Sequence, residues 1–300
     1  MDGLLLVDKP VDLSSNQVLQ QVRLLVAARR AGHTGTLDLK ASGLLAICLG
    51  RATRLSGWLL DARKRYVAEV ALGVSTTTGD AEGEVVERVA VAALDRSRIE
   101  AACQGFLGES TQVPPMYSAL KRGGRPLYAL ARAGQEVERE ARTICIHELR
   151  VLAVEGEGFS FEVSCSKGTY VRTLAEDIGR ALGLPAHLAA LRRTAVGPHR
   201  LEDAVTLPEL ITAQERGETS RFIRSSDSVL ADLPALQLDA ADVQRVIHGQ
   251  PARAAGGGGT GGLRLYAEGG DFLGVGERRA DGSIWPRRLL GGGAGADLAL

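Results

Sequence analysis

The chain has 300 residues, of which 45% are hydrophobic and 24% charged. This composition is ordinary for a soluble globular protein and excludes global disorder, and the length predicts one large domain with an appendage, or two domains. The chain carries 36 basic and 36 acidic side chains, and a formal charge of zero speaks, as a total, against a nucleic-acid partner. The charges are distributed in blocks, however. Residues 1–65 carry 10 basic and 5 acidic side chains, and residues 111–200 carry 13 and 9, so positive surfaces can coexist with a neutral sum.

No segment approaches the ~20 apolar residues that a membrane helix needs, and the first ten residues lack the basic start of a signal peptide. We therefore expect a cytoplasmic protein that does not associate with membranes. The four cysteines are spread singly, without a C-x-x-C pair. This spacing predicts reduced thiols rather than a disulfide framework or a zinc site.

The first part of the chain predicts a mixed fold in which strands and helices alternate irregularly. Apolar runs and alternating patterns indicate strands, 3.6-residue periodicity indicates helices, and glycine or charged clusters indicate loops. In chain order, we expect a strand at 3–8, a helix at 17–28 after the serines at 14 and 15, a glycine loop at 32–43, strands at 44–49 and 66–72, an acidic turn at 76–84, a helix at 95–106, a basic turn at 122–126, a helix at 127–133, strands at 143–154 and 158–164, and a helix at 171–182.

A domain boundary is predicted near 225–233, where a polar stretch and Pro234 interrupt the pattern. Beyond it we expect a small β-rich module at 233–290. It comprises a strand at 235–238, a capped helix at 239–248, a flexible glycine tract at 256–259 and three short strands. The glycine-rich end, 291–300, is predicted to be a flexible tail.

The densest chemical signal lies between residues 31 and 43. Three glycines there allow a close approach of the backbone, and they enclose His33 and Asp38. The segment is not a phosphate-binding Walker A loop, because Gly43 is followed by two leucines rather than by Lys and Ser or Thr. From composition alone, a plain surface loop in which Asp38 forms a turn is an equal alternative.

A second cluster, at residues 166–173, lies at a strand-to-helix junction. The start of a helix attracts anions, and Arg172 can bind a carboxylate or a phosphate through two hydrogen bonds. The alternative is a capped helix with a solvated Arg172. Tyr66 follows two cations, Lys64 and Arg65, and taken alone it predicts a half-buried packing residue.

Taken together, these segments resemble the bacterial tRNA pseudouridine-55 synthase family, the TruB-type pseudouridine synthases. Ordered motifs over the first two-thirds of the chain carry the resemblance, at 3–10, 14–16, 30–38, 64–66, 115–121, 164–173 and 191–193. It implies an α+β fold with a catalytic domain over 1–225, whose mixed, mainly antiparallel sheet is flanked by helices. The C-terminal module resembles, more loosely, a small PUA-like RNA-binding domain.

The resemblance implies an isomerase that converts uridine to pseudouridine at position 55 of the tRNA T loop, without a metal or an organic cofactor. Asp38 matches the essential aspartate, Arg172 its cationic partner, and Tyr66 the tyrosine that stacks on the target base and is suspected of helping proton removal. A carboxylate can act as a nucleophile or shift a proton, and a positioned cation stabilises its charge. The other residues that match the base pocket are His33, Tyr170 and Leu191.

The partner implied by the resemblance is the tRNA T stem-loop, bound by a monomeric enzyme that flips the target base out of its stack. Basic side chains within or beside the matched motifs are the candidate RNA contacts: Lys9, Lys64, Arg65, Lys121, Arg122, Arg125, Lys167, Arg192 and Arg193. The turn at 122–125 is a candidate flap that closes over RNA.

The chain departs from the family pattern directly after Asp38, where Leu39-Lys40 replaces the usual Pro-Leu. Loss of the proline is expected to relax the loop. We take this departure as a variant that keeps activity. The main alternative is a non-catalytic tRNA-binding or tRNA-folding protein on the same scaffold. A carbohydrate glycosidase ranks third, because it needs two carboxylates about 5 to 10 Å apart and the matched motifs contain one.

Overall fold

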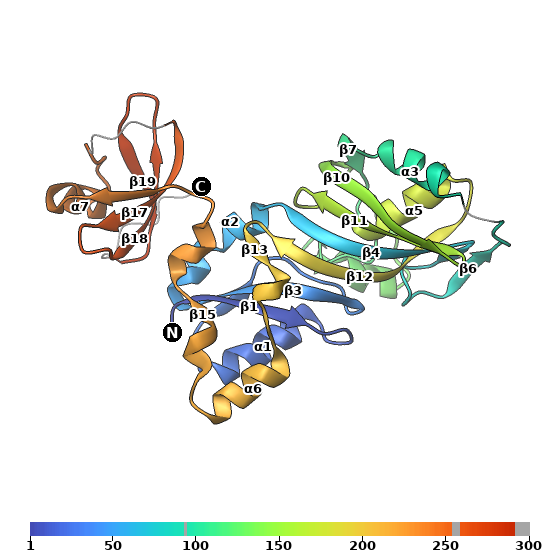
Figure 1. Ribbon diagram of the computed structural model, residues 1–300, viewed down its shortest axis with the longest axis horizontal. Coiled ribbons are helices and arrows are strands. Elements are labelled where there is room, and N and C mark those ends of the chain that lie inside the picture. Colours follow the sequence, from blue (N-terminus) through green and yellow to red (C-terminus); the bar gives the residue numbers. More distant parts are fainter. Residues whose placement is uncertain (93–94, 254–258, 292–300) are drawn as a thin grey trace.

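A computed structural model describes residues 1–92, 95–253 and 259–291. Most of the predicted glycine tract at 256–259, and the predicted tail beyond residue 291, lie outside the described residues. The described chain forms a large sheet with helices against it and a separate small sheet at the C-terminal end (Figure 1). The predicted α+β architecture is confirmed.

The large sheet comprises 11 strands in the described chain, with β14-β1-β3-β12-β4-β11-β10-β7 as its main order. Most neighbours pair antiparallel, whereas β1 with β14 and β12 with β3 are parallel. The strands are β1 (Gly3–Lys9), β2 (Ala31–His33), β3 (Ala41–Leu49), β4 (Lys64–Leu72), β7 (Gly108–Gln112), β10 (Arg142–Glu155), β11 (Gly158–Cys165), β12 (Ala186–Val196), β13 (His199–Arg200), β14 (Val205–Thr206) and β15 (Ile223–Arg224).

Helices bury the two halves of this sheet in separate cores. Apolar residues of α1 and α6 pack on β1 and β3, whereas those of α3 and α5 pack on β4, β10, β11 and β12. The helices are α1 (Ser15–Leu25), α2 (Ser56–Asp61), α3 (Arg96–Gln104), α4 (Leu127–Arg132), α5 (Val171–Ala181), α6 (Leu207–Glu215) and α7 (Ala240–Ile247). Short 3-10 turns are η1 (Gly50–Leu55), η2 (Leu201–Asp203), η3 (Thr219–Phe222) and η4 (Ser226–Leu230).

Two hairpins project from this body. One pairs β5 (Val74–Thr76) with β6 (Val85–Arg88), and the other pairs β8 (Lys121–Arg122) with β9 (Arg125–Pro126). The turn of the second hairpin consists of Gly123 and Gly124, which have positive φ angles of 57° and 81°. Both central residues of a type I′ turn need positive φ, and glycine adopts it without steric cost.

The small C-terminal sheet has the order β16-β17-β18-β19 and is covered by α7. Its strands are β16 (Ala235–Leu238), β17 (Gly261–Ala267), β18 (Phe272–Arg278) and β19 (Ile284–Leu289). The Tyr266 hydroxyl donates to Asp227 Oδ2 at 2.6 Å, and Arg54 Nη1 donates to the Leu289 carbonyl at 3.2 Å. These bonds and shared apolar contacts hold the small sheet against the N-terminal half of the large one.

Most predicted elements are confirmed within a few residues. The first helix begins two residues earlier than predicted, at Ser15, because Ser14 and Gln17 form a capping box, and it ends three residues earlier, at Leu25. The loop predicted at 32–43 is also shorter, since β2 extends to His33 and β3 begins at Ala41.

Strand β12, in the middle of the sheet, was missed by the sequence patterns. It pairs with β4 through two irregularities, between Leu188 and Ala190 and between Arg193 and Ala195. Each irregularity shifts the alternation of inward and outward side chains, so a strict period of two is not visible in the sequence. No helix in the described part of the chain is long and apolar enough to cross a membrane.

Candidate active site

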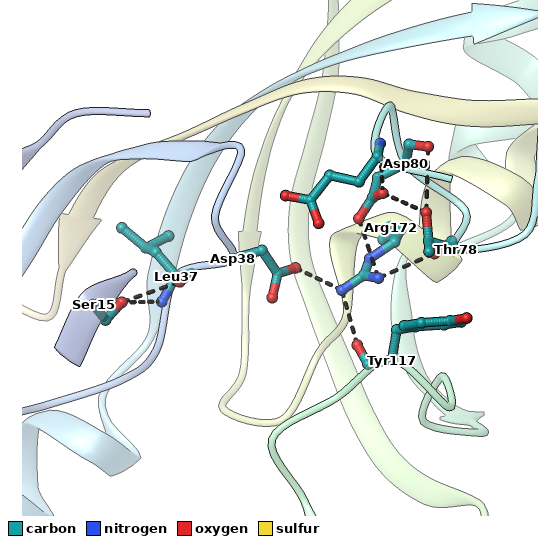
Figure 2. A network of polar contacts seen from close by, with 8 residues as sticks. Ser15, Leu37, Asp38, Thr78, Asp80, Tyr117 and Arg172 are labelled. Carbon is teal, nitrogen blue, oxygen red and sulfur yellow. Dashed lines mark hydrogen bonds and ion pairs between the residues drawn. The ribbon is translucent and has the colours of Figure 1, made fainter. Parts of the chain in front are cut away.

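Asp38 lies in the loop that joins β2 to β3, and its carboxylate meets Arg172 from the first turn of α5. Arg172 Nη2 donates to Asp38 Oδ2 at 2.6 Å (Figure 2). The Arg172 side chain is 5% exposed, whereas that of Asp38 is 47% exposed. The arginine is therefore part of the protein interior, and the carboxylate it holds can reach a ligand.

Arg172 is fixed by contacts to two further loops. Its Nη1 donates to the Thr78 carbonyl at 3.0 Å and lies 3.1 Å from Asp80 Oδ2, and its Nη2 also donates to the Tyr117 carbonyl at 3.2 Å. Asp80 is in turn held by the Thr78 hydroxyl at 2.5 Å. Because a guanidinium donates in fixed planar directions, these partners determine where it presents its charge to Asp38.

The loop that carries Asp38 is anchored along its length. The Ser15 hydroxyl accepts from the Leu37 N–H at 2.8 Å and donates to the Leu37 carbonyl at 3.0 Å. Arg193 Nη2 donates to the Gly35 carbonyl at 3.0 Å. Gly43, just beyond the loop, has φ +100°, and a Cβ there would lie 2.3 Å from the Arg193 carbonyl. The parallel pairing of β3 and β12 thus requires glycine at this position.

The replacement of Pro-Leu by Leu39-Lys40 is accompanied by contacts to the loop after β1. The Asp12 N–H donates to the Leu39 carbonyl at 2.9 Å, and Lys40 Nζ lies 2.7 Å from Asp12 Oδ1. Lys9 Nζ reaches the same Leu39 carbonyl at 3.5 Å. The expected relaxation of this loop is therefore opposed by hydrogen bonds.

A pocket of about 380 Å³ opens beside Asp38. Tyr66 of β4, Leu191 of β12 and Tyr170, directly before α5, line it together with Asp38 and Arg172. These five residues of the sequence prediction are thus brought together. His33 is outside the lining; it lies on β2, and its Nδ1 is buried without a hydrogen-bond partner among the described residues.

The two pocket tyrosines favour their neutral forms. Burial raises the pKa of Tyr66, and the nearby Arg193 acts in the opposite direction. Burial likewise raises the pKa of Tyr170. Neutral phenol rings suit stacking against a flat base.

Gln112 of β7 fixes the backbone of Tyr170. Its side-chain oxygen accepts from the Tyr170 N–H at 2.8 Å, and its side-chain nitrogen donates to the Tyr170 carbonyl at 3.1 Å. Gln112 is 6% exposed. These two hydrogen bonds satisfy the backbone N–H and carbonyl of Tyr170 at the start of α5, where the Tyr170 side chain does not cap the helix.

Three of the candidate RNA contacts are buried. Lys9 is fully buried and donates to the carbonyls of Pro10 and Leu13, and Lys64 is 7% exposed and donates to those of Leu59 and Ala62. Arg193 is 1% exposed. Burial lowers the pKa of both lysines to about 8. These cations hold loops together and are not surface phosphate contacts in this conformation, although Lys64 and Arg193 form part of the pocket wall.

The remaining candidates are more accessible. Lys121, Arg122 and Arg125 are exposed on the β8–β9 hairpin, and Lys167 lines the pocket and pairs with Asp61. Arg65 pairs with Glu148 at 2.9 Å.

Arg192 points away from the pocket. It lies between Leu191 and Arg193, which both line the pocket, and adjacent side chains of a strand point to opposite faces. It pairs with Asp8 at 2.6 Å.

Sequence reasoning missed Ser15, Asp80 and Gln112 as parts of this site. Asp80 lay within a segment interpreted as an acidic turn, and no local pattern connects it with an arginine 92 positions later. Gln112 gave no signal in the sequence either, because only the fold shows that it is buried and therefore needs partners. Within the described residues, no group of three or more His, Cys, Asp and Glu side chains is arranged to hold a metal ion.

Three family models match the chain from residue 23 to residue 231 and from residue 234 to residue 290. Residues 23–171 match the TruB family pseudouridylate synthase (N terminal domain), residues 172–231 the tRNA pseudouridylate synthase B C-terminal domain, and residues 234–290 the C-terminal domain of pseudouridine synthase II TruB.

Curated relatives match at nearly full length. A tRNA pseudouridine synthase B of Ectopseudomonas mendocina is 50% identical over 297 residues, covering 98% of this chain and 97% of the relative. That of Pseudomonas aeruginosa is 49% identical, covering 97% and 96%.

Two solved structures resemble the fold. A chain of a Cbf5-Nop10-Gar1 complex superposes with a TM-score of 0.70 at 28% identity, over 92% of this chain and 78% of that one. A chain of an H/ACA RNP bound to a substrate RNA containing 2′-deoxyuridine gives 0.69 at 27%, over 92% and 77%.

Proposed function

The chain belongs to the TruB family of pseudouridylate synthases, and on that premise we propose that it converts uridine 55 in the T loop of tRNA to pseudouridine. The observation that best supports this proposal is the half-exposed carboxylate of Asp38. It is held 2.6 Å from a buried Arg172, at a pocket lined by two tyrosines and a leucine. The relatives are named as enzymes acting on tRNA, and the pocket supplies the groups that such a reaction needs.

The reaction is an isomerisation, so no group has to be supplied or removed. The bond between N1 of uracil and C1′ of ribose breaks, the base turns within the pocket, and a bond forms between C5 and C1′. The proton on C5 leaves, and N1 gains one. Asp38 is the carboxylate that acts at the nucleotide, and Arg172 holds it in place and stabilises its charge.

The target base has to leave the stacked loop to reach Asp38. The pocket volume, about 380 Å³, lies within the roughly 300–1,000 Å³ typical of small-ligand sites. The faces of Tyr66 and Tyr170 and the side chain of Leu191 provide stacking and apolar contact that offset the cost of unstacking. His33, outside the pocket lining, is assigned to the space that the flipped nucleotide leaves in the RNA.

The RNA approaches across the rim of this pocket. Ser118, Ala119 and Leu120 line the pocket and lead directly into the β8–β9 hairpin, whose Lys121, Arg122 and Arg125 are exposed. We assign these three cations, with Lys167, to phosphate contacts, and the hairpin to a flap that closes over bound RNA.

The domain limits that we propose are 1–225 for the catalytic domain and 233–290 for the PUA-like module. In that module Arg287 pairs with Glu277, and Arg279 stacks on Trp285 at 4.3 Å. The ion pair with Glu277 reduces the net positive charge that Arg287 offers to RNA. We further propose a monomer that works in the cytoplasm, where tRNA is modified, without a metal or an organic cofactor.

The alternatives from the sequence are a non-catalytic RNA binder and a glycosidase. A half-exposed carboxylate in the pocket repels phosphate and favours catalysis over simple binding. The second carboxylate that a glycosidase needs is absent from the described pocket lining, since Asp80 is 10% exposed and bonded behind Arg172.

The test is a tritium-release assay. A T stem-loop RNA labelled at C5 of its uridine is incubated with the protein, and the released tritium is counted. The unaltered chain is expected to release it, and Asp38→Asn to bind the RNA with unchanged affinity while releasing none. Binding without release by the unaltered chain would support the non-catalytic alternative, and substantial turnover by Asp38→Asn would remove Asp38 from the mechanism.

A further inference from the structure

Two adjacent serines at the start of α1 use their hydroxyls differently. Ser14 caps the helix: its Oγ accepts from the Gln17 N–H at 3.2 Å, and the Gln17 side chain accepts from the Ser14 N–H at 2.8 Å. Ser15, which is 1% exposed, bonds across the chain to both backbone groups of Leu37. The capping box thus leaves the Ser15 hydroxyl available to the loop that carries Asp38.

The contact bears on catalysis because Leu37 directly precedes Asp38. Leu37 is 3% exposed, so its side chain and both of its backbone polar groups are fixed. Figure 2 shows Ser15 and Leu37 on one side of Asp38 and Arg172 on the other. The carboxylate lies between these two supports, and its own side chain is half exposed.

The neighbouring anchors act further along the loop. Arg193 holds the Gly35 carbonyl, two residues before Leu37, and Asp12 holds the Leu39 carbonyl, two residues after it. Ser15 therefore fixes the middle of the loop, where a shift moves Asp38 most directly.

We propose that Ser15 is a positioning residue for the carboxylate of Asp38. This inference rests on the proposed function. Ser15 acts through its two hydrogen bonds to Leu37, and its hydroxyl does not touch substrate. A misplacement of about 1 Å at a catalytic group can cost on the order of 100-fold in rate, so removal of these bonds should lower the chemical step without weakening RNA binding.

The experiment compares Ser15→Ala with Ser14→Ala. Single-turnover rates at saturating C5-labelled T stem-loop RNA, the RNA dissociation constant and the thermal midpoint are measured for both and for the unaltered chain. Ser15→Ala is expected to lose about 10- to 100-fold in rate with its dissociation constant within twofold. Ser14→Ala loses a helix cap, so its midpoint is expected to fall while its rate stays within twofold.

Ser15→Cys provides a graded variant of similar size, whose thiol is a weak donor and acceptor. Its rate is expected between those of the unaltered chain and Ser15→Ala, and it replaces Ser15→Ala if the alanine variant does not fold. Rates within twofold for the folded Ser15 variants, a matching loss in Ser14→Ala, or a loss of RNA affinity that accounts for the effect would overturn the proposal. An inactive unaltered chain would instead refute the proposed function.

Discussion

Asp80 Oδ2 lies 3.1 Å from Arg172 Nη1, so the arginine that holds Asp38 also holds a second carboxylate, which is 10% exposed. The two carboxylates bind different nitrogens of one guanidinium. We therefore expect Asp80 to be the counter-charge that keeps Arg172 in place if Asp38 acts on a substrate as proposed.

Asp80→Asn should lower the single-turnover rate by about 10- to 100-fold and leave RNA affinity within twofold, because Arg172 loses its fixed partner but stays buried. The matched control is Glu84→Gln, an exposed carboxylate in the same loop, which should change the rate less than twofold. A rate for Asp80→Asn equal to that of the control would show that Thr78 and Tyr117 suffice to hold the arginine.

Gln112→Leu removes both side-chain bonds to Tyr170 while keeping a similar volume. We expect a loss of about 2 kcal/mol in the free energy of unfolding, at about 1 kcal/mol for each bond, together with a severalfold rise in KM for RNA. Urea denaturation and the tritium assay measure the two effects. Thr111→Val, at an exposed neighbouring position on β7, is the control, and an unchanged KM in Gln112→Leu would separate Gln112 from the pocket.

Lys40→Ala tests the loop that replaces the usual Pro-Leu. The ion pair with Asp12 has side chains 50% and 62% exposed, so its removal should cost little stability, and the cost should shrink in high salt. The rate should change less than threefold, because the Asp12 N–H still holds the Leu39 carbonyl. A tenfold loss at low salt that salt does not alter would contradict this account.

The burial of Lys64 should make the free energy of unfolding depend measurably on pH. Burial lowers its pKa from 10.5 to about 8, so between these pH values the unfolded chain binds more protons than the folded one. Stability from this group therefore rises as pH increases through that window and is lost as pH falls through 8. The upper bound of this change in the free energy of unfolding is about 3 kcal/mol.

The measurement compares the unaltered chain with Lys64→Met by urea denaturation at pH 7.5, 9 and 10. The difference in unfolding free energy should move in favour of the unaltered chain as pH rises. The buried thiol of Cys48, whose pKa is raised to about 12, works in the opposite direction, but it is present in both proteins and cancels. Lys167→Met, an exposed site, should run parallel to the unaltered chain, and a parallel course for Lys64→Met would contradict the prediction.

The sequence was informative where one segment carries its own signal. Periodicity and capping residues predicted most helices and strands. The family resemblance carried by the motifs around Asp38 and Arg172 implied the central ion pair, which the structure contains. Tyr66, Tyr170 and Leu191 also come together in the predicted pocket.

Contacts between distant segments outside the matched motifs were the part that could not be predicted. Lys9 and Arg193 were predicted as RNA contacts because they are basic residues within the matched motifs, whereas the fold buries both against backbone carbonyls. Asp80 and Gln112 meet their partners only through tertiary packing. In β12, two irregularities interrupt the alternation of inward and outward side chains that would have predicted a strand.

The position of β12 between β3 and β4 has a consequence for the synthesis of the chain on the ribosome. β4 ends at residue 72, but the strand that joins it to β3 begins at residue 186. At about 5 to 20 residues per second, roughly 6 to 23 seconds pass between the two events. Until then the facing edges of β3 and β4 are unpaired, and an unpaired strand edge is a template for aggregation. The newborn chain therefore exposes two unpaired edges in that interval, and the pocket is complete only once about two-thirds of the chain has been made.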